Sequence, residues 1–194
     1  MANKAQPVLR KDIIKQTAHR MFKDKGYAAT SMRDLAKAVG IEAASLYNHI
    51  SSKEEILNEI CFDIASQFFQ AFEKAVTTEK TPSKKLKAAI HAHIGVIVNN
   101  LDASTVFFHE WIFLKEPDLA KFKKLRFQYE QSFRDIIEKG IEKGDFKDMN
   151  VKLVSFTIFS ALNATYDLYK TNERLSQDEI AESISNLLLK GIKK

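Results

Sequence analysis

Residues 30–57 read TSMRDLAKAVGIEAASLYNHISSKEEIL, and this stretch decides the fold of the N-terminal part of the chain. Apolar residues recur at helical spacing before and after Gly40, and both segments are short. Two short helices joined by a glycine-containing turn form a helix-turn-helix unit, whose second helix enters the major groove of DNA. The stretch therefore predicts a DNA-binding unit.

The residues around this stretch predict where its helices begin and end. A helix over residues 9–25 precedes it and ends at Gly26. Ser31 and Asp34 form a weak capping box for the helix that follows. Two overlapping capping boxes, Ser51 with Glu54 and Ser52 with Glu55, predict the start of a long helix that extends to about residue 76. This helix is long enough to leave the N-terminal unit and enter a second domain.

The helix after Gly40 differs from an ordinary surface helix in its outward side chains. Leu46 and Ile50 share an inner face, whereas Ser45, Asn48 and His49 point elsewhere. Small, hydrogen-bonding side chains suit a close approach to base edges and phosphates. These residues are therefore candidates for DNA contacts.

The rest of the chain is helical in pattern, and the predicted fold class is all-α with about nine helices. Residues 1–8 are expected to form a flexible lead, and no segment alternates with the two-residue period of a strand. The segment at 151–170 is apolar nearly all round, which predicts a helix that is buried on every side. The further helices are predicted at residues 83–101, 103–114, 117–143 and from 176 onward, where Ser176 with Glu179 forms a capping box.

Composition and charge limit the possible classes of protein. The chain has 194 residues, a formal net charge of +5 and a pI near 9.1, and the first 60 residues hold ten basic against seven acidic side chains. A basic balance favours polyanionic partners. The single cysteine, Cys61, cannot form an internal disulfide, and it reads as an ordinary buried thiol. No signal peptide and no apolar stretch of about 20 residues is present, so a cytoplasmic protein without a membrane partner is expected.

Many positions of the N-terminal part agree in order and spacing with one family of DNA-binding domains. Residues 8–68 resemble the DNA-binding domain of TetR-family transcriptional regulators. The residues that carry this resemblance are Gly26-Tyr27, Thr30, Arg33-Asp34-Leu35-Ala36, Gly40-Ile41, Leu46-Tyr47-Asn48-His49 and residues 52–57. The resemblance implies a homodimer that reads the two halves of a double-stranded operator. It also implies a C-terminal ligand-binding and dimerisation domain at 69–194, with the dimer interface in the last two helices.

The resemblance also implies roles for individual residues. Thr30 would cap the second helix and touch a phosphate, and Tyr47, His49 and Lys53 would grip the DNA backbone. The full set of expected DNA-binding residues is Thr30, Ser31, Arg33, Glu42, Ala43, Ala44, Ser45, Tyr47, Asn48, His49 and Lys53.

Three residues depart from the family pattern, namely Glu42, Ala44 and Ile50. Ile50 is a substitution within the core. Glu42 stands where base contacts are made, so it either accepts from a cytosine amino group or caps the helix, and the cap is the favoured interpretation.

The C-terminal part resembles the ligand domains of TetR-type regulators of lipid and acyl-CoA metabolism, through Phe108-His109-Glu110-Trp111, Gly144-Asp145-Phe146, Tyr169 and residues 175–181. The expected ligand is a small apolar or amphipathic molecule, with fatty acyl-CoA as one candidate. Its expected binding residues are His93, Phe108, His109, Trp111, Tyr129, Asn163 and Tyr166, although each of them also reads as a structural residue. Phosphate groups on such a ligand could bind the basic residues at 84–87 or 121–124. Without such a ligand, these two segments are predicted to be solvated helix faces.

Catalytic and metal sites are not expected. His91 and His93 are two positions apart and point in different directions on a helix, and His109-Glu110 lacks the second histidine of a zinc-protease motif. We find no catalytic constellation and no cofactor-binding motif in the sequence.

The favoured hypothesis is a repressor that a ligand releases from its operator. Two alternatives remain open at this point: an activator or a regulator that answers a protein partner, and an all-helical enzyme or carrier.

Overall fold

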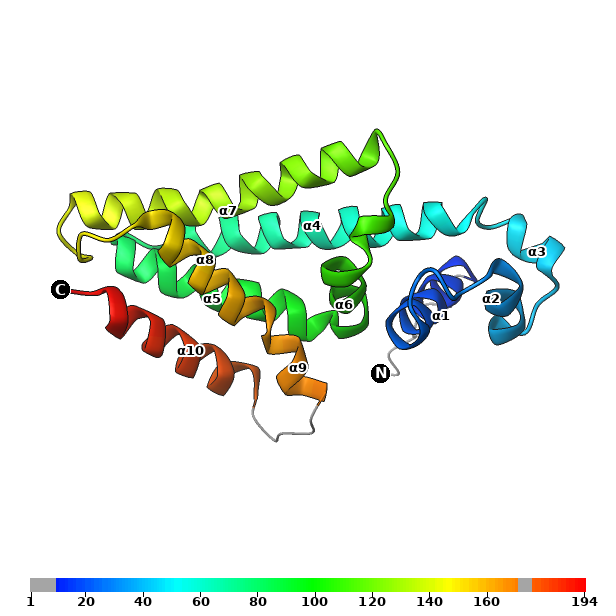
Figure 1. The fold of residues 1–194 in the computed structure, drawn as a ribbon. Helices are drawn as coiled ribbons and strands as arrows, with labels where there is room; N and C mark the ends of the chain where they lie inside the picture. The colour runs from blue at the N-terminus through cyan, green and yellow to red at the C-terminus, as the bar shows by residue number, and fades with distance from the viewer. Residues whose placement is uncertain (1–9, 171–175) are drawn as a thin grey trace, which may run out of the picture.

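The computed structural model describes residues 10–170 and 176–194, and within them the fold is all-α, as predicted (Figure 1). The helices are α1 (Arg10–Lys25), α2 (Met32–Val39), α3 (Ala43–Tyr47), α4 (Lys53–Thr77), α5 (Pro82–Asn99), α6 (Leu101–His109), α7 (Asp118–Glu142), α8 (Val151–Asn163), α9 (Thr165–Lys170) and α10 (Gln177–Ile192), with a 3-10 helix, η1 (Trp111–Phe113), after α6. The described residues hold one more α-helix than the nine expected, because the segment predicted as one helix at 151–170 is divided into α8 and α9 at Ala164. The predicted lead at 1–8 and Leu175 lie outside the described residues.

The helices form a small unit and a larger bundle, and α4 runs through both. Helices α1–α3 gather at one end of the molecule, and α4 leads away from them between α7 and α5 (Figure 1). Near its start, Ile56 and Leu57 of α4 are fully buried, and farther along the same helix Ile64 and Phe68 are buried as well. One continuous helix therefore contributes to the cores of both parts.

The helix boundaries follow from capping interactions in the sequence. Ser31 forms the predicted capping box, since its Oγ accepts from the Asp34 amide at 3.1 Å and its own amide donates to the Asp34 carboxylate at 3.2 Å. Ser52 caps α4 by accepting from the Glu55 amide at 3.1 Å, whereas the Glu55 carboxylate accepts from the amide of Ser51. Neither of the two predicted boxes is complete, because the Glu55 carboxylate does not return to the Ser52 amide and Glu54, the expected partner of Ser51, pairs with Lys115.

Helix α8 is exposed along one side, which corrects the prediction that it is buried all round. Val154, Ile158 and Leu162 are buried, but 64% of Leu153 and 69% of Phe156 are exposed.

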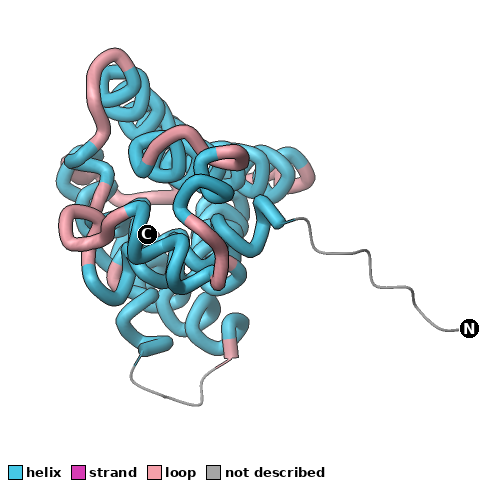
Figure 2. The backbone as a smooth tube through the Cα atoms, turned by 90° about the vertical axis from the view of Figure 1, so that its right-hand side faces the viewer, coloured by secondary structure: helices cyan, strands magenta, loops and turns pink. Residues whose placement is uncertain are grey.

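The described part of the chain contains no β-strand, and its one β-type contact is an isolated bridge (Figure 2). None of its helices combines the length and apolar character that are needed to cross a bilayer.

Candidate DNA-binding surface and ligand pocket

The helix-turn-helix forms as the sequence predicts. Gly40 ends α2 with φ +76°, a conformation that glycine adopts at little cost, and its amide donates to the carbonyls of Ala36 and Lys37. Leu35, Ala36 and Leu46 are buried beneath the turn. Helix α3 is only five residues long, so most of its side chains are close to the surface.

Two of the expected roles in this unit are corrected by the structure. Thr30 does not cap α2, because Ser31 takes that position. Only 2% of Thr30 is exposed, and its hydroxyl donates to the Gly26 carbonyl at 3.0 Å, so this side chain faces the interior and does not lie on the outer surface. Glu42 occupies the N-cap position of α3, but its side chain makes no capping hydrogen bond. The favoured interpretation of Glu42 as a cap is therefore wrong.

The remaining expected DNA-binding residues lie on or near one exposed region formed by α2, α3 and the start of α4. Tyr47 is 52% exposed although it is aromatic. The exposed members are Ser31, Arg33, Glu42, Ala44, Tyr47 and Asn48, and the half-buried members are Ala43, Ser45, His49 and Lys53. The arrangement presents hydroxyl, amide, imidazole and cationic groups together, which are the groups that bind phosphates and base edges.

Lys53 is held by the chain itself at the first residue of α4. Its ammonium donates to the Tyr27 carbonyl at 2.7 Å and lies 4.2 Å from the centre of the Tyr27 ring. Burial, followed by the negative charge of Glu54, raises the pKa of Tyr27 to about 12. The ammonium has three donors, so contact with a phosphate remains open to it, but its position is set by Tyr27.

Tyr27 also connects the small unit to the bundle, which sequence reasoning did not reveal. Its amide donates to the Glu110 carboxylate at 3.1 Å, directly after α6, and its ring stacks on Phe113 of η1 with centroids 5.3 Å apart. Two ion pairs add to this connection, Lys23 with Asp102 at 2.6 Å and Lys115 with Glu54 at 2.8 Å. Helix α6 and the segment after it therefore contact the DNA-binding unit directly.

An aromatic pocket lies inside the bundle among α4, α5, α6, α7 and α8. Its volume is about 40 Å³, room for only about three water molecules, so a larger ligand must displace side chains. Four of the seven expected ligand-binding residues line it, namely His93, Phe108, Tyr129 and Asn163. The other lining residues are Ala65, Phe68, Phe69, Phe107, Leu125, Arg126, Glu130 and Phe159.

The three other expected ligand-binding residues lie outside the pocket lining, close to its edge. The His109 imidazole hydrogen-bonds the Tyr166 hydroxyl at 2.6 Å, and the Tyr166 ring stacks on Phe108. The guanidinium of Arg126 lies over the Trp111 ring, 4.8 Å from the centre of that ring. Arg126 was missed, although a charged residue within the apolar stripe of α7 is an available signal for a pocket lined by that helix.

His93 is the most deeply buried ionisable group of the pocket. It is 2% exposed, it stacks on Phe68 with centroids 4.5 Å apart, and its Nδ1 hydrogen-bonds the Tyr129 hydroxyl at 3.2 Å. Burial lowers the pKa of His93 to about 3, with Asn163 opposing the shift, and burial also raises the pKa of Tyr129. Both groups are therefore neutral at physiological pH.

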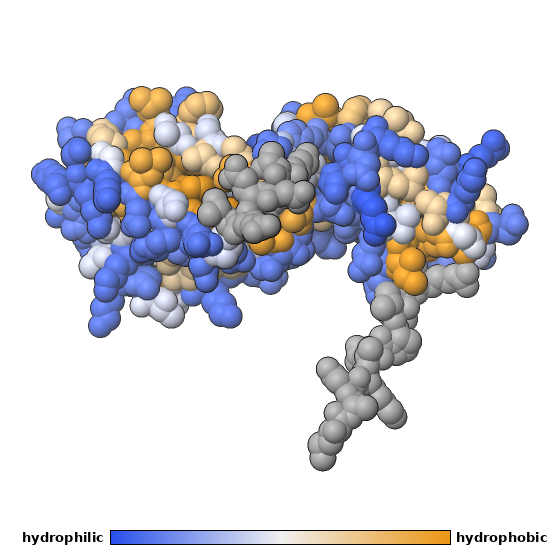
Figure 3. Space-filling model, turned by 90° about the horizontal axis from the view of Figure 1, so that it is seen from below, coloured by the Kyte–Doolittle hydropathy of each residue, from blue (hydrophilic) through white to orange (hydrophobic). Residues whose placement is uncertain are grey.

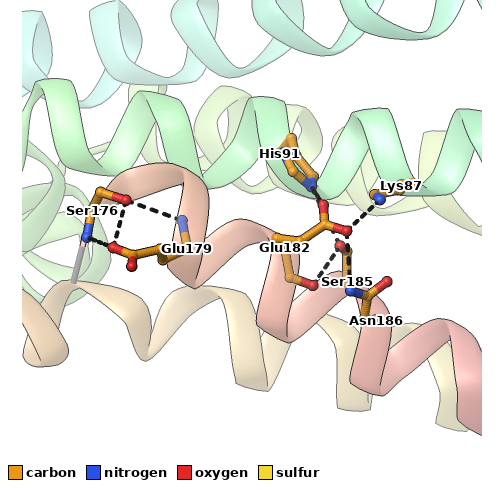
Figure 4. A network of polar contacts seen from close by, with 7 residues as sticks. All are labelled: Lys87, His91, Ser176, Glu179, Glu182, Ser185 and Asn186. Atoms are coloured by element: carbon orange, nitrogen blue, oxygen red, sulfur yellow. Dashed lines mark hydrogen bonds and ion pairs between the residues drawn. The ribbon is translucent and has the colours of Figure 1, made fainter.

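An exposed apolar face lies on α8 and α10. Leu187 of α10 is 75% exposed, and Leu153 and Phe156 of the neighbouring helix α8 are exposed as well. From below, hydrophobic surface gathers at the end of the molecule that holds these two helices (Figure 3). On its inner side α10 is tied to α5 by polar contacts, because Glu182 accepts from Lys87 at 2.7 Å and lies 3.5 Å from His91 (Figure 4).

Metal ligands do not gather in the described residues. His91 faces α10 and His93 faces Tyr129, so the two imidazoles diverge along α5. Within residues 10–170 and 176–194 no group of three His, Cys, Asp or Glu side chains is placed to hold a metal ion.

Cys61 is fully buried as predicted, and burial raises the pKa of its thiol to about 12.

Comparison with known proteins agrees with this architecture. Residues 14–60 match the family model described as bacterial regulatory proteins, tetR family, and residues 79–192 match the tetracyclin repressor-like C-terminal domain. The HTH-type transcriptional repressor KstR2 of Mycolicibacterium smegmatis is 28% identical over 200 residues, with 97% of this chain and 93% of KstR2 covered.

Solved structures share the fold over nearly the whole chain. The ketosteroid transcriptional regulator KstR2 of Mycobacterium tuberculosis superposes with a TM-score of 0.91 at 26% identity, over 97% of both chains. AibR, solved in complex with isovaleryl coenzyme A and operator DNA, has a TM-score of 0.82 at 23% identity, over 93% of this chain and 98% of AibR. On the two family matches and these relatives, the chain belongs to the TetR family of bacterial transcriptional regulators.

Proposed function

We propose that this chain is a homodimeric repressor that leaves its operator when a small apolar or amphipathic ligand enters the aromatic pocket. Fatty acyl-CoA is the candidate class, in line with AibR, whose structure holds isovaleryl coenzyme A and operator DNA. We divide the chain by function into a DNA-binding part at 8–68 and a ligand-binding and dimerisation part at 69–194. The boundary is not a structural break, because Phe68 lies within the continuous helix α4. We infer a regulator and not an enzyme, acting in the cytoplasm where the chromosome is.

One structural observation supports a coupling between ligand binding and operator binding. Helix α6 lines the pocket with Phe107 and Phe108, and the residue after it, Glu110, hydrogen-bonds the Tyr27 amide in the DNA-binding unit. A ligand that enlarges the small pocket would displace lining side chains, and those of α6 are among them. Because Tyr27 also positions Lys53, such a movement reaches the operator-facing side of the unit.

The DNA contacts are proposed for the exposed region of α2, α3 and the start of α4. Tyr47, His49 and Lys53 would bind phosphates, and Ser45 and Glu42 would face base edges. Glu42 is exposed and free of a capping bond, which favours its other interpretation, acceptance from a cytosine amino group.

The homodimer is proposed to form through α8 and α10. A patch that exposes Leu153, Phe156 and Leu187 to this degree is costly to leave in water, and a second copy of the same face would cover it. Pairing of two such faces would place two recognition helices on successive half-sites, about 34–36 Å apart.

The experiment is a gel-shift titration with DNA that flanks the gene of this protein. We expect a retarded band whose affinity falls steeply with salt. Tyr47→Ala should weaken binding to all sequences alike, and Glu42→Ala should change the preference among sites. Lys124→Ala, an exposed lysine on α7, is the control and should change neither. Absence of a salt-dependent band would overturn the assignment, and a changed site preference in Tyr47→Ala would overturn the role of Tyr47.

A further inference from the structure

Two buried polar atoms in the pocket have no hydrogen-bond partner. They are Nε2 of His93 and Oδ1 of Asn163, and both residues belong to the pocket lining. An unpaired buried polar atom is destabilising, so such atoms are rare unless a ligand or a water molecule satisfies them. Here two of them border one cavity.

The two atoms are complementary as a donor and an acceptor. Burial keeps the Tyr129 hydroxyl protonated, so it can donate to Nδ1 of His93 at 3.2 Å. In that tautomer Nε2 carries the proton. A hydrogen-bonding interaction with the Asn163 side chain opposes the lowering of the His93 pKa, so the amide lies near the imidazole, although Nε2 and Oδ1 do not reach the geometry of a direct hydrogen bond.

We propose that His93 and Asn163 form an anchor for one uncharged oxygen, a hydroxyl or a carbonyl, on an otherwise apolar ligand. A hydroxyl would accept from Nε2–H and donate to Oδ1. A carbonyl would accept from Nε2–H and, after the Asn163 amide turns by half a rotation, from its NH2 group. This inference rests on the proposed function, because it names the ligand class of the same pocket.

The surroundings of the anchor favour a neutral group. Six of the twelve lining residues are phenylalanine or tyrosine, and the His93 imidazole itself is neutral. The two charged lining residues are engaged on other partners, since Arg126 lies over Trp111 and Glu130 pairs with Arg134 at 3.3 Å. Burial of an ionised group at His93 and Asn163 would therefore lack a compensating charge.

Asn163 connects the anchor to α8, a helix of the proposed dimer interface. It is the last residue of α8, the helix that also exposes Leu153 and Phe156. A ligand oxygen bound to Asn163 therefore acts on a helix of the proposed interface, in addition to the displacement of α6.

The test uses three probes of similar shape: 1-phenylethanol with a hydroxyl, acetophenone with a carbonyl, and isopropylbenzene with neither. Amide chemical shifts of the full chain, followed by NMR during titration, give each Kd and locate the probe. We expect the two oxygenated probes to bind about tenfold more tightly than isopropylbenzene, as one net hydrogen bond supplies. A preference for the alcohol alone assigns the donor–acceptor arrangement, and an equal preference for the ketone assigns the rotated amide.

Asn163→Leu removes the acceptor at similar volume, and because Nε2–H of His93 remains, we expect it to reduce the preference for the oxygenated probes while isopropylbenzene still binds. Asn99→Leu makes the same change on the exposed end of α5 and should leave the preference intact. Equal Kd values for all three probes in the unmodified protein, or a preference that Asn163→Leu leaves unchanged, would overturn the anchor and leave the regulator in place. Failure of every probe to bind in the pocket would count against both.

Discussion

Gly140 on α7 is the position where one methyl group should damage the fold most clearly. A Cβ built there would lie 2.1 Å from Cδ2 and 2.3 Å from Cε2 of the Phe146 ring. Ordinary carbon contacts are about 3.5–4.0 Å, so the ring would have to move by more than about 1 Å. Phe146 is only 1% exposed, so a shift of its ring would have to displace the atoms packed around it.

The magnitude follows from two opposing contributions. Gly→Ala in a helix stabilises by up to about 1 kcal/mol, whereas overpacking a core costs about 1–3 kcal/mol and expulsion of a phenylalanine about 3–5 kcal/mol. We therefore expect Gly140→Ala to lower the free energy of unfolding by about 1–3 kcal/mol. The damage would spread to the α7–α8 loop and the end of α10, since the Lys147 amide next to Phe146 donates to the Ile192 carbonyl at 2.8 Å.

Urea unfolding at one fixed protein concentration measures this effect. Gly191→Ala is the matched control, because Gly191 also lies in a helix but no atom is within 4 Å of its built Cβ. It should be neutral or stabilising by up to about 1 kcal/mol. In a Phe146→Ala background, Gly140→Ala should no longer destabilise. A Gly140→Ala protein as stable as the unmodified chain would refute the close packing of α7 on Phe146.

Three further outcomes are expected. Phe156→Glu and Leu187→Glu should each yield monomers in light scattering, and a dimer that persists in both would contradict an interface on α8 and α10. The pKa of His93 is lowered from 6.5 to about 3 in the folded chain, so the unfolded chain binds the extra proton and stability falls as the pH drops through this range. When the pH is lowered from 7 to 5, the free energy of unfolding of His93→Phe should therefore fall by about 2 kcal/mol less than that of the unmodified chain. An equal fall in both proteins would contradict a neutral buried imidazole. Glu110→Ala removes the bond to the Tyr27 amide, so ligand should weaken operator binding less in this variant; an unchanged ligand effect on the operator Kd would exclude this contact from the coupling.

The helices could be predicted from the sequence because their signals are local. Apolar spacing, the Ser31 and Ser176 capping boxes and Gly40 identify the elements, and the structure forms both boxes. The exposure of Leu153 and Phe156 could not be predicted in this way, because an all-apolar helix has the same pattern whether its own chain or a second copy covers it. Thr30 was misjudged since two adjacent residues, Thr30 and Ser31, are both good N-caps, and only the folded turn selects between them.

The pocket was predicted in part for a related reason. His93, Tyr129 and Asn163 are polar residues on apolar helical stripes, and this contrast marks them in the sequence. Phe68 and Phe159 are indistinguishable from core residues, because a pocket wall and a packed core use the same side chains. The contact between Glu110 and Tyr27 joins residues 83 positions apart, and no local pattern connects them.

The central claim is that occupancy of the aromatic pocket decides whether the operator is bound. Fluorescence anisotropy with a labelled operator fragment, titrated with and without decanoyl-CoA, measures this directly, while calorimetry reports whether the acyl-CoA binds. Ligand releases DNA only through its different affinity for the two states. We predict an operator Kd at least about tenfold higher with bound ligand, as a coupling of about 1.4 kcal/mol requires. An operator Kd that stays unchanged while calorimetry shows the pocket occupied would contradict the account.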